Sequence, residues 1–158
     1  MLPKFVNKPL MALAATKGGA RAYRWLLPRL DRIVQRVTGG KRTFTSLVLP
    51  TFVLVTTGRR SGTLREQPLV HVAVDNGWAV VGTNWGQDHH PAWTHNLLAD
   101  PSASVRVGGR EVAVTARLLA GAERDGVYAR FEALSPNYAA YKVWSGKDVR
   151  VFALERQA

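Results

Sequence analysis

Three arginines and one serine lie within a short glycine-rich stretch, TTGRRSGTLREQP, which begins at Thr56. They are Arg59, Arg60, Ser61 and Arg65. Glycine turns free backbone N–H groups, the serine adds a hydroxyl, and guanidinium groups match a phosphate through paired hydrogen bonds. The usual role of an Arg-Arg pair in a turn is a solvated hairpin tip. Because Arg65 and Gln67 alternate into the following strand, Arg65 can point back toward the loop, which favours an anion-binding site.

Two aromatic segments offer a second kind of contact. Trp93 and Asn96 lie three residues apart in HHPAWTHNL, where an indole face and an amide could meet a planar heterocycle. Tyr138 and Tyr141 lie three apart in SPNYAAYKVW, where phenols could cap a pocket or donate a proton. For each pair, packing in the core is the common alternative.

Several well-known catalytic patterns are missing from the sequence. There is no nucleophile elbow, and GRRSG lacks the lysine and the length of a P-loop. His89 or His90 lies five or six residues from His95, which does not match the spacing of three or four that shares a helical face. We therefore expect no metal site and no conventional catalytic dyad.

The elements that must position these residues are mainly strands. The sequence predicts a strand over 47–57, two strands over 68–84 across the Asp75-Asn76-Gly77 turn, a hairpin over 102–118 across Gly108-Gly109, and a last strand over 150–154. Helices are predicted from His90-Pro91 to Asp100 and over 122–134. Hairpin connections indicate a largely antiparallel sheet, and six strands of this length can close into a small barrel with flanking helices.

Positive charge is concentrated at the N-terminus. The 158 residues carry a net charge of +11, and residues 1–50 hold ten Lys/Arg against the single acid Asp31. This asymmetry points to a polyanionic partner, either nucleic acid or anionic lipid. We divide the chain into a basic N-terminal arm, residues 1–42, and a β-barrel domain that would bind the ligand, residues 43–158. After the arm, Gly39-Gly40 predicts a break.

An amphipathic helix is predicted over Ala20–Val37. Its apolar stripe is Leu26, Leu30, Ile33 and Val37, and its cationic positions are Arg21, Arg24, Arg32 and Arg36. Pro28 would kink it or mark a first turn. The helix either packs on its own domain or lies on an anionic membrane, with Trp25 and Tyr23 at headgroup depth.

No disulfide is possible without cysteine, and no apolar stretch reaches the length of a membrane span. The apolar segment Leu10–Ala15 is too short for a signal peptide. We expect a cytoplasmic protein that can be peripheral on the inner face of the membrane.

Five segments together carry a resemblance. TTGRRSGTLREQPL, GTNWG, HHPAWTHNLLADPSASVRVGGREVAVTAR, SPNYAAY and VFALE occur in the order seen in the nitroreductase-family deazaflavin-dependent oxidoreductases. From Leu47 to Glu155 the sequence resembles this family. The resemblance implies a split β-barrel related to the flavin-mononucleotide (FMN)-binding split barrels. It also implies coenzyme F420, an 8-hydroxy-5-deazaflavin with a phosphate and an oligoglutamate tail.

The resemblance also implies roles for single residues. Phosphate would be held by Arg59, Arg60, Ser61 and Arg65, and the side-chain groove would be lined by Glu66, Gln67, Pro68, Leu69 and Val70. The deazaflavin ring and ribityl chain would be bordered by Val81, Gly82, Thr83, Asn84, Ala92, Trp93, Thr94, His95 and Asn96, with Tyr138 closing the site. Tyr138, Tyr141 and Thr83 are the candidates for orienting the acceptor or delivering a proton.

The acceptor implied is a quinone or another activated, electron-poor compound, nitro compounds included. The chain departs from the family pattern at Arg60, often lysine, at Thr83-Asn84-Trp85-Gly86, often Ser-Lys-Gly-Gly, and at Ser135, tyrosine in some quinone-reducing members. These departures leave the acceptor open. An FMN-dependent split-barrel oxidoreductase and a non-enzymatic nucleic-acid-binding protein remain the alternatives, although the latter leaves the arginine loop unexplained and no nucleic acid is expected.

Overall fold

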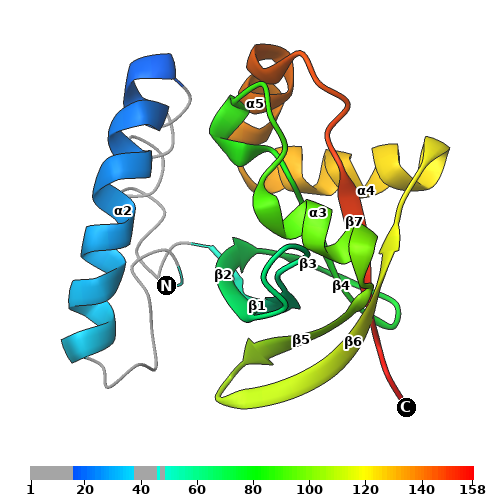
Figure 1. Cartoon of the computed structure of the whole chain (residues 1–158). Helices are drawn as coiled ribbons and strands as arrows, with labels where there is room; N and C mark the ends of the chain where they lie inside the picture. Colours follow the sequence, from blue (N-terminus) through cyan, green and yellow to red (C-terminus); the bar gives the residue numbers. More distant parts are fainter. Residues whose placement is uncertain (1–15, 38–45, 47–48) are drawn as a thin grey trace.

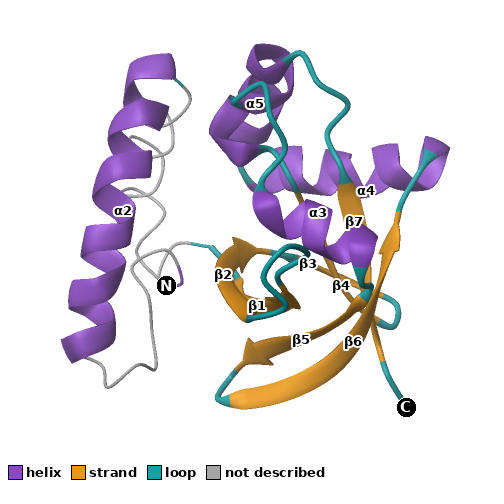
Figure 2. Cartoon of the chain, viewed as in Figure 1, coloured by secondary structure: helices purple, strands orange, loops and turns teal. Residues whose placement is uncertain are grey.

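Seven strands form one antiparallel sheet in the computed structural model, which describes residues 16–37, 46 and 49–158. The strands are β1 Thr51–Thr57, β2 Leu64–Val70, β3 Val72–Val74, β4 Gly77–Val81, β5 Ser102–Val107, β6 Arg110–Leu118 and β7 Val151–Arg156. Their order across the sheet is β2-β1-β5-β6-β7-β4-β3, and every neighbouring pair runs antiparallel. Figure 1 and Figure 2 show the sheet curled rather than flat.

The two edge strands of this sheet follow each other in the chain. β2 ends at Val70, β3 begins at Val72, and His71 between them donates its backbone N–H to the carbonyl of Pro50 at 3.1 Å. Strands at opposite edges can be consecutive only if the sheet curls back on itself, so the fold is a split barrel, as predicted. The prediction of six strands was one short. The predicted strand is interrupted at His71, so β2 pairs with β1 while β3 pairs with β4.

Both predicted hairpins are confirmed. β3 and β4 pair across the turn at Asp75 and Asn76, and β5 and β6 pair across Gly108-Gly109, where both glycines have positive φ. The first strand begins at Thr51 rather than at 47, and residues 47 and 48 lie outside the described residues. The last strand runs two residues beyond its predicted end, to Arg156.

Over residues 16–37 and 49–158, four α-helices and one short 3-10 helix flank the sheet. They are α2 Lys17–Val37, η2 Asn84–Gly86, α3 Ala92–Ala99, α4 Gly121–Leu134 and α5 Asn137–Ser145. α2, α3 and α4 confirm the predicted helices, whereas α5 was not predicted. The chain restarts as α5 after Pro136, which is tolerated at a helix start, and it ends at Gly146 with a left-handed φ of 60°.

The sheet buries side chains on both of its faces. One core cluster joins Phe52, Trp78 and Phe152 with Trp93 of α3, and a second joins Ala79 and Val151 with side chains of α4 and α5. Successive residues of a strand point to opposite faces, so the fully apolar runs of β4 and β7 supply both clusters. The second cluster anchors α4 and α5 beside the barrel.

α2 stands beside the barrel as a separate rod (Figure 1). It runs through Pro28 and begins at Lys17, so Pro28 does not mark its first turn. The Gly39-Gly40 break and the boundary between residues 42 and 43 lie outside the described residues. Within the described ranges, no helix is both long and apolar enough to span a bilayer.

Candidate functional site

A cleft of about 1280 Å³ opens between the loop that follows β1, strand β2, the chain after β4, α3 and α5. It collects all the expected site residues except two. The expected residues that line it are Arg59, Arg60, Ser61, Arg65, Glu66, Gln67, Pro68, Leu69, Val70, Val81, Thr83, Asn84, Ala92, Trp93, His95, Asn96, Tyr138 and Tyr141. Segments that are far apart in the sequence therefore form one continuous wall.

Gly82 and Thr94 are the two exceptions, and they pack against each other behind the wall. A Cβ atom on Gly82 would lie 2.8 Å from Cγ2 of Thr94, so this close approach requires glycine. The Thr94 hydroxyl donates to the carbonyl of Pro91 at 2.8 Å and accepts from Arg150 at 3.1 Å. The pair supports the start of α3 instead of facing the cleft.

The arginine loop is a tight turn built on two glycines. The N–H of Gly62 donates to the carbonyl of Gly58 at 2.7 Å, and Gly62 has a φ of 66°. A Cβ atom on Gly58 would lie 2.6 Å from Oγ of Ser61 and 3.1 Å from the carbonyl oxygen of Thr63, so the turn leaves little room for a side chain there. Arg59, Arg60 and Ser61 are exposed on this turn, where cations and a hydroxyl face the cleft.

Asn96 fixes the root of the arginine loop. Its side-chain oxygen accepts the backbone N–H of Arg59 at 3.1 Å, and its amide nitrogen donates to the hydroxyl of Thr56 at 3.0 Å. Asn96 is buried, so this bridge ties α3 to the end of β1 in a water-poor environment. The amide suggested by the sequence as a partner for a heterocycle thus already holds the loop, and Trp93 packs on Phe152 in the core.

His95 lies between the arginine loop and Arg150. A guanidinium nitrogen of Arg150 lies 3.3 Å from Nδ1 of His95, and because arginine can only donate, Nδ1 accepts and Nε2 carries the proton. Burial lowers the pKa of His95, and the positive charges of Arg150, Arg59 and Arg60 lower it further. The neutral imidazole therefore offers an N–H donor near the cationic, arginine-loop end of the cleft. Sequence reasoning missed Arg150, which belongs to no motif.

Tyr138 and Tyr141 face each other at the other end of the cleft. Their rings are 6.2 Å apart, and the ring of Phe131 lies 5.2 Å from that of Tyr138. Burial raises the pKa of Tyr141 to about 12, with a smaller contribution from Tyr23 of α2. Burial also raises the pKa of Tyr138. Both phenols are neutral hydrogen-bond donors at ordinary pH.

The chain between β4 and α3 forms the wall beside these tyrosines. Trp85, His89, His90 and Pro91 line the cleft from this segment without having been expected as site residues. The indole of Trp85 meets the ring of Tyr141 edge-on at 6.1 Å. Their adjacency to Thr83 and Ala92 in the sequence was the signal that could have identified them.

α2 closes the open side of the cleft with a side that is mainly charged. Arg24, Leu27, Asp31 and Arg32 line the cleft from this helix. Of the predicted apolar stripe, Leu26, Ile33 and Val37 are 47%, 56% and 82% exposed, whereas Leu30 is half-buried. α2 therefore contacts its own domain through the side that lines the cleft, as one of the two predicted alternatives expected, while most of the predicted stripe stays exposed. Tyr23 is half-buried, whereas Trp25 is 66% exposed.

Comparison with known proteins gives a consistent relationship. The profile of the F420H(2)-dependent quinone reductase family matches residues 26–156. A relative from Mycobacterium tuberculosis (strain ATCC 25618 / H37Rv), named F420H(2)-dependent quinone reductase, is 27% identical over 113 residues, which cover 68% of this chain and 74% of the relative. A putative F420H(2)-dependent quinone reductase from Mycobacterium bovis has the same identity and coverage.

Solved structures agree with these relatives. The structure of F420-H2 dependent reductase (FDR-A) is 35% identical with a TM-score of 0.61, over 67% of this chain and 94% of that one. Campylobacter jejuni ChuZ, at 15% identity and a TM-score of 0.51, covers 80% of this chain and 60% of its own, and shares the fold alone. The resemblance seen in the sequence is confirmed, and the chain belongs to the F420H(2)-dependent quinone reductase family.

Proposed function

We propose that this chain binds coenzyme F420 in the cleft and uses its reduced form to reduce quinones or other activated acceptors, nitro compounds among them. One observation carries the proposal. The cleft has three arginines and a serine at one end, and buried aromatic side chains at the other. This donor set fits a ligand that is multiply anionic at one end and flat and aromatic at the other.

The parts of the cleft would then divide the ligand between them. The phosphate would be held by Arg59, Arg60, Ser61 and Arg65, and the side chain would lie along residues 66–70 of β2. The deazaflavin ring and its ribityl chain would be bordered by Val81, Thr83, Asn84, Ala92, Trp93, His95 and Asn96, with Gly82 and Thr94 supporting this wall from behind. Glu66, the acid in this groove, forms an ion pair with Arg106, which offsets its charge.

The protein's own groups would orient the acceptor and provide protons. Reduced coenzyme F420 supplies the hydride when it is bound, so the protein has no need for a catalytic dyad. Tyr138, Tyr141 and the hydroxyl of Thr83 are the proposed donors. All three are buried at the ring end, where exclusion of water strengthens a hydrogen bond to an acceptor oxygen.

α2 supports a proposal about where the enzyme works. Its outward side carries Trp25, Leu26, Ile33 and Val37, and arginines flank them. Such a face suits an anionic membrane surface, where lipophilic quinones reside. We propose that the arm, residues 1–42, places the barrel domain, residues 43–158, at the inner face of the membrane as a peripheral protein.

The testing experiment is a fluorescence titration of the protein with oxidised coenzyme F420, beside FMN. Saturable binding of the deazaflavin alone is expected. Arg60→Ala should weaken it roughly tenfold to a hundredfold, because a charge-assisted hydrogen bond contributes about 1.5–3 kcal/mol. Arg110→Ala is the matched control, since Arg110 is an exposed arginine at the start of β6 and away from the cleft, and this variant should change nothing.

The other outcomes separate the alternatives. Preference for FMN would keep the barrel and the phosphate loop but move the chemistry to the flavin alternative. Binding of neither cofactor, together with nucleic-acid binding that falls steeply with salt, would favour the second alternative.

A further inference from the structure

The segment Thr83–His89, between β4 and α3, contains two adjacent residues in the left-handed region. Asn84 has a φ of 51° and Trp85 a φ of 58°. This conformation is unfavourable for a residue with a Cβ atom, and it persists only where neighbouring contacts impose it. The segment lines the cleft, so the contacts that impose its shape also shape the cleft.

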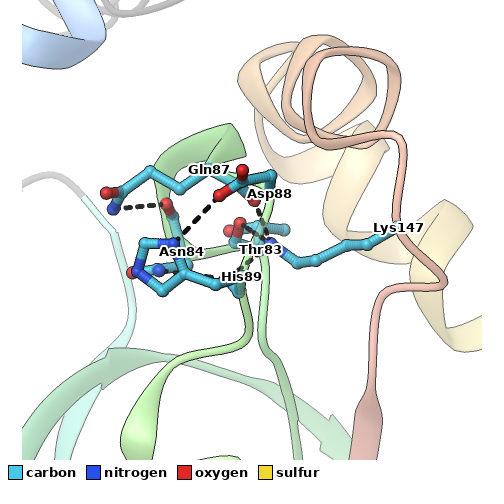
Figure 3. Close-up of polar contacts among 6 residues, drawn as sticks. All are labelled: Thr83, Asn84, Gln87, Asp88, His89 and Lys147. Carbon is cyan, nitrogen blue, oxygen red and sulfur yellow. Dashed lines mark hydrogen bonds and ion pairs between the residues drawn. The ribbon is translucent and has the colours of Figure 1, made fainter.

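Lys147 supplies these contacts from a distant part of the chain. Its ammonium donates to the carbonyl of Thr83 at 2.9 Å and to that of His89 at 3.1 Å, and it also donates to the carbonyl of Gln87 (Figure 3). A lysine ammonium has three N–H groups, and each has a carbonyl partner here. Lys147 therefore fastens both ends and the middle of the segment.

Hydrogen bonds within the segment complete the clamp. The side-chain amide of Asn84 donates to the carbonyl of His89 at 3.2 Å, and that of Gln87 donates to the carbonyl of Asn84 at 3.1 Å. These bonds are local, whereas Lys147 lies after α5, some 58 to 64 residues further along the chain. The lysine thus connects the segment to the end of the helix that carries Tyr138 and Tyr141.

The clamped segment holds Trp85 against α5 at close range. The Trp85 indole meets the ring of Tyr141, and a Cβ atom on Gly86 would lie 3.1 Å from Trp144 and 3.3 Å from Cα of Tyr141. There is little room to move toward the helix. The position of this segment therefore sets the width of the cleft beside the two tyrosines.

We propose that Lys147 is a positioning residue that locks the Thr83–His89 segment, and that the locked Trp85 indole selects flat aromatic acceptors at the tyrosine end of the cleft. This rests on the proposed function of the cleft. A large rigid indole gives a flat acceptor a stacking surface, and it excludes bulky non-planar ones. A mobile segment would lose both effects.

The first measurement is hydrogen–deuterium exchange on the full chain without cofactor. In Lys147→Met, amides of the Thr83–His89 segment should exchange at least about tenfold faster, as the loss of one charge-assisted hydrogen bond implies. Lys147→Arg, which keeps a cationic donor, should restore part of the protection. Lys142→Met, a lysine on the outer side of α5, is the control and should leave the segment unchanged.

The second measurement separates positioning from folding. In Lys147→Met, the KM for menadione should rise about fivefold or more, while the affinity for coenzyme F420, whose phosphate would be held by the arginine loop, should fall by clearly less. Trp85→Gly should remove the preference for menadione over a bulky non-planar quinone without unfolding the chain, since glycine accepts a positive φ.

Two results would overturn the inference: unchanged exchange of the segment in Lys147→Met, or an F420 affinity that falls in parallel with acceptor use. Should the parent protein bind no F420, the proposed function fails but the inference is still tested. Menadione quenching of tryptophan fluorescence in the cofactor-free protein would then decide. Weaker quenching in Lys147→Met supports the inference, and equal quenching contradicts it.

Discussion

The four tyrosines of the chain all lie where the neutral phenol is favoured. Burial raises the pKa of Tyr23, Tyr128, Tyr138 and Tyr141, and neighbouring groups add to the effect in the last three. Tyr128 also donates its hydroxyl to the carbonyl of Tyr138 at 2.7 Å, which joins α4 to the start of α5. At the scale of single residues, the cleft therefore offers neutral donors at one end and permanent cations at the other.

This gives a direct prediction for an alkaline titration. A folded pKa above the unfolded value means that stability is fully present below pH 10 and is lost as pH rises through the folded value, about 12 for Tyr141. The near-ultraviolet absorbance of tyrosinate should therefore rise little at pH 10 and steeply only at higher pH. In denaturant the midpoint should return to the ordinary value near 10. A folded protein that titrates at 10 would contradict these environments.

A second residue-scale prediction concerns turnover. Tyr138→Phe, Tyr141→Phe and Thr83→Val each remove one hydroxyl and keep most of the packing volume. The variant that removes a proton donor should lose roughly 10²–10⁴-fold in kcat, with coenzyme F420 affinity largely kept. Steady-state kinetics on the three variants test this. Full turnover in all three would show that the protons come from elsewhere.

At the scale of elements, α2 has two different sides, and each needs a partner. Its cleft-facing side, with Arg24 and Arg32, closes the cleft, while Leu26, Ile33 and Val37 of its apolar stripe are exposed. An exposed apolar stripe on a cationic helix is unfavourable in water unless something covers it. We therefore expect an outward partner for this face, and an anionic membrane has the matching chemistry.

Liposome co-sedimentation tests this expectation. The double variant Ile33→Asp, Val37→Asp should lose binding to anionic vesicles. It removes apolar area that the lipid would cover and adds negative charge that anionic lipid repels. Val143→Asp is the matched control, since Val143 is also a highly exposed apolar residue, on α5. If the double variant still binds as the parent does, the stripe is not the membrane contact. If the double variant has half the mass of the parent protein in solution, the stripe binds a second copy of the chain instead.

At the scale of the whole molecule, His71 closes the split barrel. It lies between the edge strands β2 and β3, stacks on Phe52 at 4.7 Å and meets Trp78 edge-on at 6.4 Å. Its Nδ1 is buried and has no hydrogen-bond partner among the described residues. Burial lowers its pKa, so the closed sheet favours the neutral ring.

Acid stability should reveal this closure. A histidine with a lowered folded pKa contributes stability that is present above its ordinary value of 6.5 and is lost as pH falls below it. His71→Phe keeps the stacking and cannot protonate, so its free energy of unfolding should fall less than the parent's between neutral and mildly acid pH. His90 and His95 also have lowered pKa values, but both proteins keep them. Urea unfolding at a series of pH values measures the difference, and equal slopes of the free energy of unfolding against pH for the parent and His71→Phe would exclude the effect.

Local chemistry determined what could be predicted from the sequence. Turns at Asp75 and Asn76 and at Gly108-Gly109 announced the hairpins, because their residues accept the backbone angles that tight turns require. The buried strands and the period of α2 followed from apolar spacing. The arginine loop was visible as a candidate anion site because guanidinium groups, serine and glycines occur together within a few residues. The five segments, in their order along the chain, indicated the family.

Tertiary contacts decided what the sequence left open. The interruption of the strand at His71 follows from the placement of β2 and β3 at opposite edges of a curled sheet. Lys147, Arg150 and Asn96 acquire their contacts through neighbours that lie 37 to 64 residues away in the chain, and no local pattern records such pairings. The exposure of most of the α2 stripe is likewise not recorded in any local pattern. Periodicity shows that a helix has an apolar side, but what that side meets depends on how the whole chain packs.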